Sequence, residues 1–164
     1  MTTILAKHSA PSFELNDTRG KTISLAECLK KGAVVAAFFK VSCPVCQFTF
    51  PFLERLYKAY GSKGVTFLGI SQDNKEDTLE FLKEHGVTFP TLIDQPGYAA
   101  SNAYGLTNVP SIFLIGSDGK VLVSETGFDK KALEAISKEV AGQLGESAVA
   151  VFRPGEAIPD YKPG

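Results

Sequence analysis

Two cysteines separated by two residues, Cys43 and Cys46, are the side chains with the clearest capacity for chemistry in this chain. Pro44 and Val45 lie between them, and a spacing of i, i+3 places both sulfur atoms on one face of a helix. At a helix N-terminus, unpaired backbone N–H groups and the helix dipole favour a thiolate over a thiol. The pair can therefore cycle between a dithiol and a disulfide. We expect Cys43, at the exposed tip, to be the nucleophile and Cys46, one turn inside, to be the resolving thiol.

A buried strand and a helix are predicted to position this pair. Residues 33–39 are apolar throughout and rich in branched and aromatic side chains, which is typical of a strand buried on both faces. Over residues 47–57 apolar side chains recur at helical spacing, and we expect the helix to continue to Tyr60. Pro51 falls inside this helix and should kink it. The cysteines thus lie where the strand ends and the helix begins.

The rest of the chain alternates between strand and helix patterns. In the first half this alternation predicts parallel strands joined by right-handed crossovers. We expect a single domain over residues 1–145 and a tail over residues 146–164 that is laid on the surface or partly disordered, because the tail is rich in turn residues. Before the motif we expect an N-terminal hairpin (12–24) and a short helix capped by Ser24 (25–31). After the motif helix we expect a strand (65–71) and then a helix that starts at Asp73 or Asn74, stops at Gly86 and has Leu79, Phe81 and Leu82 on its apolar side. The remaining expected elements are a strand (88–93), a helical stretch opened by Pro96-Gly97 (98–104), an antiparallel hairpin (111–115 and 120–124) and a closing helix (129–144).

Composition limits the classes of partner and compartment. The chain has 164 residues, of which 44% are hydrophobic and 21% charged, and its net charge of −1 provides no strong field to attract nucleic acid or an anionic membrane. No apolar run approaches the ~20 residues of a membrane-spanning helix, so we expect no membrane insertion. Residues 1–11 contain no apolar signal-peptide core, which indicates the cytoplasm for the sequence as it stands, or a periplasmic or other extracytoplasmic site if an export signal has been removed. We expect a monomer.

Metal binding is an alternative use of two cysteines at this spacing. A structural zinc site needs four ligands, but the chain has one further cysteine, Cys28, and two histidines, His8 and His85, in no metal-ligand pair. We therefore expect no bound metal and no cofactor. Cys28 is interpreted as a small, partly buried apolar residue, with a second resolving cysteine as the alternative. A copper(I) carrier is a further alternative, although Met1 is the only methionine.

Several stretches together carry a family resemblance. They are Ala10–Leu15 and Gly20–Leu25 at the N-terminal hairpin, the motif Cys43–Cys46, the kinking Pro51, the loop Asn108–Ser111, and Ile112–Ile115 with Asp118–Lys120 in the last hairpin. With these stretches, residues 10–145 resemble the thioredoxin fold, specifically the TlpA/ResA-like branch of the alkyl hydroperoxide reductase and thiol-specific antioxidant superfamily. The resemblance implies an α/β thioredoxin-like fold, with a central mixed β-sheet flanked by helices and an N-terminal β-hairpin extension. It also implies the activity of a thiol–disulfide oxidoreductase.

The resemblance further implies a substrate platform beside the cysteines. A cis peptide bond between Val109 and Pro110 would bring backbone next to the motif, where a substrate strand can pair with it. An ordinary trans proline that opens a strand is the alternative. Together with Pro44 and Val45, these two residues would form the substrate-binding surface. The implied partners are a disulfide-containing protein or a small thiol substrate, and an upstream thiol reductant.

Three positions depart from the family pattern. Thioredoxins usually keep a buried acid six residues before the first cysteine, where this chain has Ala37. ResA-like proteins often carry a glutamate three residues after the second cysteine, where this chain has Thr49. The aromatic residue common just before the first cysteine is replaced by Ser42. The usual proton acceptor for Cys46 is therefore missing.

A peroxiredoxin-like thiol peroxidase, with Cys43 as the peroxidatic cysteine, is the nearest alternative function. Its usual Pro-x-x-x-Thr-x-x-Cys pattern is absent, because Lys40 stands at the threonine position and residues 35–39 contain no proline. Lys40 could instead favour the Cys43 thiolate electrostatically, and it could equally be a solvated strand end. A peroxide pocket also needs a distant arginine. The arginines of the chain, none of them well placed in the sequence, are Arg19, Arg55 and Arg153.

Overall fold

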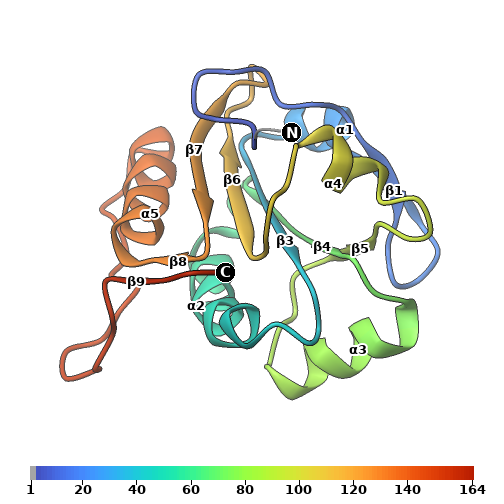
Figure 1. Cartoon of the computed structure of the whole chain (residues 1–164). Coiled ribbons are helices and arrows are strands. Elements are labelled where there is room, and N and C mark those ends of the chain that lie inside the picture. Colours follow the sequence, from blue (N-terminus) through green and yellow to red (C-terminus); the bar gives the residue numbers. More distant parts are fainter. Residues whose placement is uncertain (1–2) are drawn as a thin grey trace.

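A five-stranded mixed sheet forms the centre of the computed structural model, which describes residues 3–164 (Figure 1). The strands lie in the order β5-β4-β3-β6-β7. The central strand β3 (Val34–Phe39) pairs in parallel with β4 (Thr66–Ser71) and antiparallel with β6 (Ser111–Ile115), and the edges are β5 (Thr91–Ile93) and β7 (Val121–Thr126). Every residue of β3 is buried, which explains why its sequence shows no polar alternation. The predicted central mixed sheet is confirmed.

Helices cover both faces of this sheet (Figure 1). The core on one face includes side chains of α2 (Pro44–Tyr60), α3 (Lys75–Glu84) and α5 (Lys130–Leu144). The core on the other face includes side chains of α1 (Leu25–Leu29) and α4 (Ala99–Ala103). Since successive side chains of a strand point to opposite faces, β3 contributes alternate residues to the two cores. The motif cysteines lie on the α2 side.

The predicted N-terminal hairpin is present. Strand β1 (Glu14–Asn16) pairs antiparallel with β2 (Thr22–Ser24), outside the main sheet. The Ser24 hydroxyl then caps α1 by accepting a hydrogen bond from the Glu27 N–H (3.2 Å), as the sequence predicted.

The segment from α3 to α4 differs in detail from its prediction. Helix α3 has Asn74 as its N-cap, as expected, but Leu79, predicted on the apolar side, is 43% exposed because only a narrow side of α3 faces the core. Strand β5 begins at Thr91 rather than at residue 88, since the Thr88 N–H donates to the Glu54 carboxylate (2.8 Å) instead of to a strand. The bond before Pro96 is cis, and the turn at Pro96-Gly97 leads into α4, whose N-cap is Tyr98 and C-cap Tyr104, so the helical stretch predicted over residues 98–104 is present.

The tail, residues 146–164, has a defined path along the rest of the protein. Its short strand β9 (Tyr161–Lys162) pairs antiparallel with β8 (Phe128–Asp129). Val151 is only 2% exposed, so part of the tail contributes to the core. Figure 1 shows the end of the tail beside α2.

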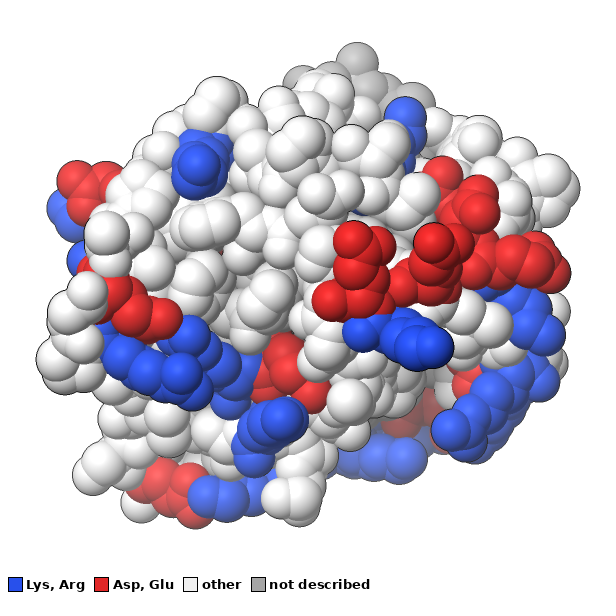
Figure 2. All heavy atoms as spheres, turned by 90° about the horizontal axis from the view of Figure 1, so that it is seen from below, with Lys and Arg blue, Asp and Glu red and all other residues white. Residues whose placement is uncertain are grey.

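Charge is unevenly distributed over the face shown in Figure 2. Acidic side chains gather over one part of this face, on the side where α3 lies in Figure 1. The exposed acidic residues of α3 are Glu76, Asp77, Glu80 and Glu84.

No helix within residues 3–164 is long and apolar enough to cross a bilayer.

Candidate active site

Cys43 is the N-cap residue of α2. Its backbone is extended (φ −84°, ψ 113°), and its sulfur accepts a hydrogen bond from the Cys46 N–H (3.1 Å). Pro44 occupies the first turn, where its missing N–H removes no helical hydrogen bond. The local sequence therefore places the Cys43 sulfur over the unpaired N–H groups at the start of the helix.

The two motif thiols differ in access to solvent. Cys43 is half-buried, whereas Cys46 is completely buried. Burial raises the pKa of the Cys46 thiol well above its ordinary value, because the charged form loses hydration. Both cysteines are free thiols in this structure. Only one of the two sulfurs is thus accessible to a partner.

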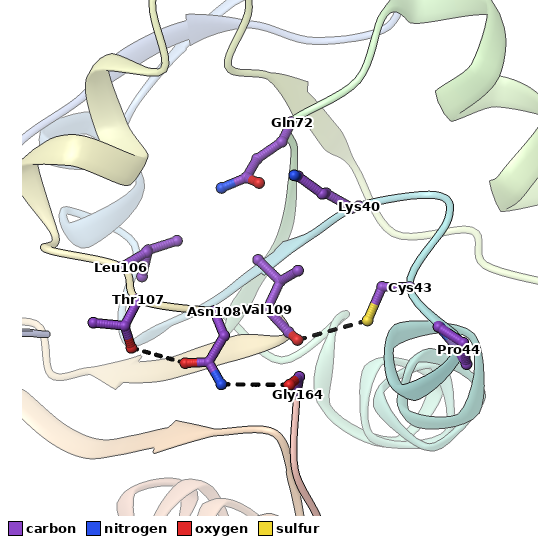
Figure 3. Close-up of a pocket in the computed structure, with 9 residues that line it drawn as sticks. All are labelled: Lys40, Cys43, Pro44, Gln72, Leu106, Thr107, Asn108, Val109 and Gly164. Carbon is purple, nitrogen blue, oxygen red and sulfur yellow. Dashed lines mark hydrogen bonds between the residues drawn. The ribbon is translucent and has the colours of Figure 1, made fainter.

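The backbone of Val109 faces the accessible sulfur. The Cys43 thiol donates to the Val109 carbonyl oxygen across 3.6 Å (Figure 3). The Val109–Pro110 peptide bond is cis, as the family resemblance implied. The Pro110 carbonyl oxygen accepts from the Gly127 N–H (2.8 Å), which ties the loop to the segment after β7. The structure therefore brings Cys43, Cys46, Val109 and Pro110 together.

Polar contacts that the sequence did not reveal hold the loop leading into α2. The Val41 N–H donates to an Asp73 carboxylate oxygen (2.8 Å), and the Gln47 side-chain amide donates to the Val41 carbonyl oxygen (2.9 Å). The Asp73 N–H in turn donates to the Ser71 hydroxyl (3.1 Å). These bonds fix the loop from the end of β4, which is distant in sequence and so gave no local pattern to detect.

A pocket of about 480 Å³ opens beside Cys43 (Figure 3). Lys40 and Pro44 lie in its wall together with Val109, whereas Val45 packs partly buried against the core. Lys40 is exposed directly after β3, so it is both a strand end and a charged part of the pocket wall. The wall also contains five residues that were not predicted as site residues, namely Gln72, Leu106, Thr107, Asn108 and Gly164.

The positions that depart from the family pattern hold no carboxylate. Ala37 is buried in β3, and Ser42 is exposed. The Thr49 hydroxyl donates back to the Val45 carbonyl oxygen (2.6 Å) within α2. Within residues 3–164, no group of three or more His, Cys, Asp or Glu residues could hold a metal ion.

Cys28 lies apart from the motif. It is buried in α1 and belongs to the core on the opposite face of the sheet from Cys46. The interpretation of Cys28 as a small buried apolar residue agrees with this position. The sheet separates it from both motif sulfurs.

Comparison with known proteins places this geometry in a family context. The sequence model of the AhpC/TSA family matches residues 6–124. The chain is 35% identical over 119 residues to the thiol-disulfide oxidoreductase ResA of Bacillus subtilis (strain 168), a match that covers 72% of this chain and 65% of that protein. It is 33% identical over 133 residues to ResA of Bacillus thuringiensis (strain Al Hakam), covering 80% of this chain and 76% of that protein.

A solved structure shows the same fold. The thioredoxin domain of a thiol-disulfide oxidoreductase from Bacteroides vulgatus matches with a TM-score of 0.75 at 23% identity, over 84% of this chain and 99% of that chain. These similarities confirm the predicted thioredoxin-like fold and the predicted resemblance to ResA-like thiol–disulfide oxidoreductases. Against the first of the two ResA proteins, the match spans slightly less than two thirds of that protein's length.

Proposed function

This chain belongs to the AhpC/TSA family, and on that premise we propose that it is a thiol–disulfide oxidoreductase working by dithiol–disulfide exchange. The observation that carries the proposal is the asymmetric cysteine pair at the start of α2. One sulfur, on Cys43, is accessible and accepts the Cys46 N–H, while the other is buried one helical turn behind it. A nucleophile with a shielded resolving thiol next to it is the arrangement that exchange chemistry needs.

The reaction follows from this arrangement. The Cys43 thiolate attacks one sulfur of a substrate disulfide, forms a mixed disulfide and expels the other substrate sulfur as a thiolate. Cys46 then loses its proton and attacks the Cys43 sulfur, so that the remaining substrate sulfur leaves as a thiolate and the two cysteines become joined. An upstream thiol reductant restores both thiols. The Val109 carbonyl, 3.6 Å from the Cys43 sulfur, supports a role for Val109 and Pro110 as the backbone platform for the substrate.

Single-cysteine variants test the two roles. We expect Cys43→Ser to lose exchange with oxidised glutathione and insulin, and Cys46→Ser to stop at a mixed disulfide that mass spectrometry detects as added mass. In the wild type, Cys43 should be alkylated faster than Cys46 near neutral pH, because only Cys43 is accessible. Exchange by Cys43→Ser at the wild-type rate would contradict the assignment.

A peroxide assay run in parallel separates this proposal from the peroxidase alternative. Arg55 already donates to the Val151 carbonyl oxygen (3.0 Å) and to both oxygens of the Glu156 carboxylate (2.9 and 2.7 Å), so its guanidinium is committed to the tail. We therefore expect disulfide reduction, measured with oxidised glutathione as well as insulin, to exceed peroxide consumption. The reverse order would favour the peroxidase.

The partners follow at two levels of detail. Membership of a thiol–disulfide oxidoreductase family implies disulfide or thiol substrates. A monomer that receives electrons from a separate thiol reductant is our proposal, and gel filtration with light scattering tests the monomer. The predicted compartment, cytoplasmic or extracytoplasmic, stays a prediction that fractionation of the source cells would test.

A further inference from the structure

The tail follows α2 from its C-terminal end back to the motif. Near the end of α2, the Val149 N–H donates to the Tyr60 hydroxyl (2.8 Å). Arg55, more than one helical turn before Tyr60 in α2, donates hydrogen bonds to the Val151 carbonyl oxygen and to the Glu156 carboxylate. The tail therefore has firm anchors at the far end and the middle of the helix.

Aromatic contacts continue the same path toward the cysteines. The Phe152 ring packs against Phe52 (5.1 Å between centroids). Closer to the motif, the Lys162 ammonium lies over the Phe48 ring (4.8 Å to the centroid). Since Phe48 is two residues after Cys46, residues 161–164, which we call the tail end, reach the active site.

The tail end packs directly on the substrate platform. A Cβ atom added to Gly164 would collide with the Val109 carbonyl oxygen, and it would lie 2.9 Å from the Val109 carbonyl carbon. The Asn108 side-chain amide donates to the Gly164 carbonyl oxygen (3.5 Å). Figure 3 shows Gly164 beside Asn108, near the Val109 carbonyl that receives the Cys43 thiol. A polypeptide strand approaching this carbonyl would meet the tail end.

The space that the tail end leaves open suits a small anionic molecule. The pocket of about 480 Å³ falls in the range of small-molecule sites, about 300–1,000 Å³. Of the nine residues that line it, Lys40 alone has a charged side chain. Lys40 makes no ion pair within residues 3–164 and is free to meet a carboxylate. Thr107, Asn108 and Gln72 add hydroxyl and amide groups.

We propose that the tail end closes the polypeptide side of the groove at Cys43, so that the site takes low-molecular-weight disulfides bearing a carboxylate, bound by Lys40, in preference to protein disulfides. The inference rests on the proposed function and names its substrate class. In the step, the Cys43 thiolate forms a disulfide with one half of the small disulfide and expels the other half as a thiolate. Cys46 then displaces the first half, so the small disulfide gains two electrons and the cysteine pair loses two.

Single-turnover rates of the reduced protein test the role of the tail end. The substrates are insulin, as the protein disulfide, and oxidised glutathione, as the small anionic one. Removing residues 161–164, with folding checked by thermal melting, should raise the ratio of the insulin rate to the glutathione rate by about fivefold or more. The full-length variant Lys162→Ala, which loses the contact with Phe48, should raise the same ratio by about twofold. Lys131→Ala, at an exposed site on α5, should not change it.

A second pair of substrates tests Lys40. Lys40→Gln should lower the ratio of the oxidised glutathione rate to the rate with neutral hydroxyethyl disulfide by about threefold. Because the ratio cancels any change in Cys43 reactivity, it reports on the carboxylate alone. Lys138→Gln, at an exposed site on α5, is the matched control.

The outcomes are distinguishable. If the variant without residues 161–164 folds and its ratio of the insulin rate to the glutathione rate is unchanged or lower, the proposal is overturned. If that variant does not fold, an unchanged or lower ratio in Lys162→Ala overturns the proposal instead. If Lys40→Gln leaves the ratio of the glutathione rate to the hydroxyethyl disulfide rate unchanged, Lys40 does not bind the substrate carboxylate. A wild-type protein that exchanges with none of the three disulfides overturns the proposed function itself, together with this inference.

Discussion

Burial of Cys46 has a kinetic consequence at the scale of single residues. Only the thiolate attacks a disulfide, and burial raises the pKa of Cys46, so little of it is ionised near neutral pH. The main physical cause, loss of hydration, persists when Cys43 is in a mixed disulfide. We therefore expect release of the second substrate thiol to accelerate by about tenfold per pH unit between pH 6 and 8.

A chromogenic aromatic disulfide measures this prediction, because its two thiolates are released in successive phases. The second phase should carry the pH dependence. Cys46→Ser, which cannot resolve the mixed disulfide, should show the first phase only. A second phase whose rate is flat between pH 6 and 8 would show that Cys46 ionises readily despite its burial.

Glu125 is a buried acid that the sequence did not single out. It is 7% exposed, and neither carboxylate oxygen has a hydrogen-bond partner within residues 3–164. Burial, with a smaller contribution from Asp129, raises the pKa of Glu125 to about 9. Through strand register, Glu125 pairs with Ile112 of β6, which pairs with Ala37 of β3. A carboxyl group therefore lies two strands away from the position at which thioredoxins usually keep a buried acid, in the same row of the sheet.

This raised pKa predicts how stability changes with pH. Between the ordinary pKa of about 4.5 and the native value of about 9, the folded protein binds more protons than the unfolded chain, so the free energy of unfolding falls as pH rises. We expect Glu125→Gln to remove this fall, which over the range from pH 5 to pH 8 amounts to about 4 kcal/mol relative to the wild type. Urea unfolding at both pH values measures it, with exposed Glu134→Gln as the control. Parallel pH profiles for wild type and Glu125→Gln would contradict the prediction.

At the scale of elements, the parts predicted well are those with strong local patterns. The all-apolar run of β3 and the Cys-Pro start of α2 were recognised from composition and capping, and the last hairpin from its turn residues. Contacts between distant segments gave no such pattern. Asp73 binds Val41 across 32 residues, and the pocket wall is assembled from loops after β3, β4 and α4.

The course of the tail was equally hidden from the sequence. Its apolar residues Val149, Val151 and Phe152 form a short run, and Ile158 stands just before a proline, but the sequence does not show which surface they cover. Their partners on α2 lie far away in the chain, as with Arg55 and Glu156, which are 101 residues apart. From the turn-rich composition we predicted a tail laid on the surface or partly disordered. The structure instead has a tail with a defined path along α2.

The pair of Arg55 and Glu156 is predicted to hold this path. Arg55 donates through two nitrogens to the carboxylate and holds the pKa of Glu156 at about 2. Lysine cannot form this fork, so Arg55→Lys should speed hydrogen exchange of the amides in residues 149–158 by about tenfold. Lys63→Gln, which breaks only the exposed pair with Glu146, should leave that exchange unchanged. Equal exchange in Arg55→Lys and wild type would show that the aromatic contacts suffice.

At the scale of the whole molecule, the sheet divides the cysteines into two compartments. Cys46 belongs to the core under α2 and α5, and Cys28 belongs to the core under α1 and α4. Layers packed on a sheet lie about 10 Å from it, which exceeds the reach of a disulfide, whose Cα atoms are at most about 7 Å apart. The fold therefore permits one disulfide partner for Cys46, which is Cys43.

Mild oxidation of the native protein tests this division. We expect one disulfide, between Cys43 and Cys46, and a Cys28 thiol that stays free. Peptide mapping identifies both, since the two motif cysteines lie in one tryptic peptide and their bridge makes it lighter by two hydrogens. Cys28→Ala should oxidise at the wild-type rate, because Cys28 takes no part. A bridge from Cys28 to either motif cysteine, formed without loss of the native fold, would mean that Cys28 is the second resolving thiol and that the sheet does not keep it from the active site.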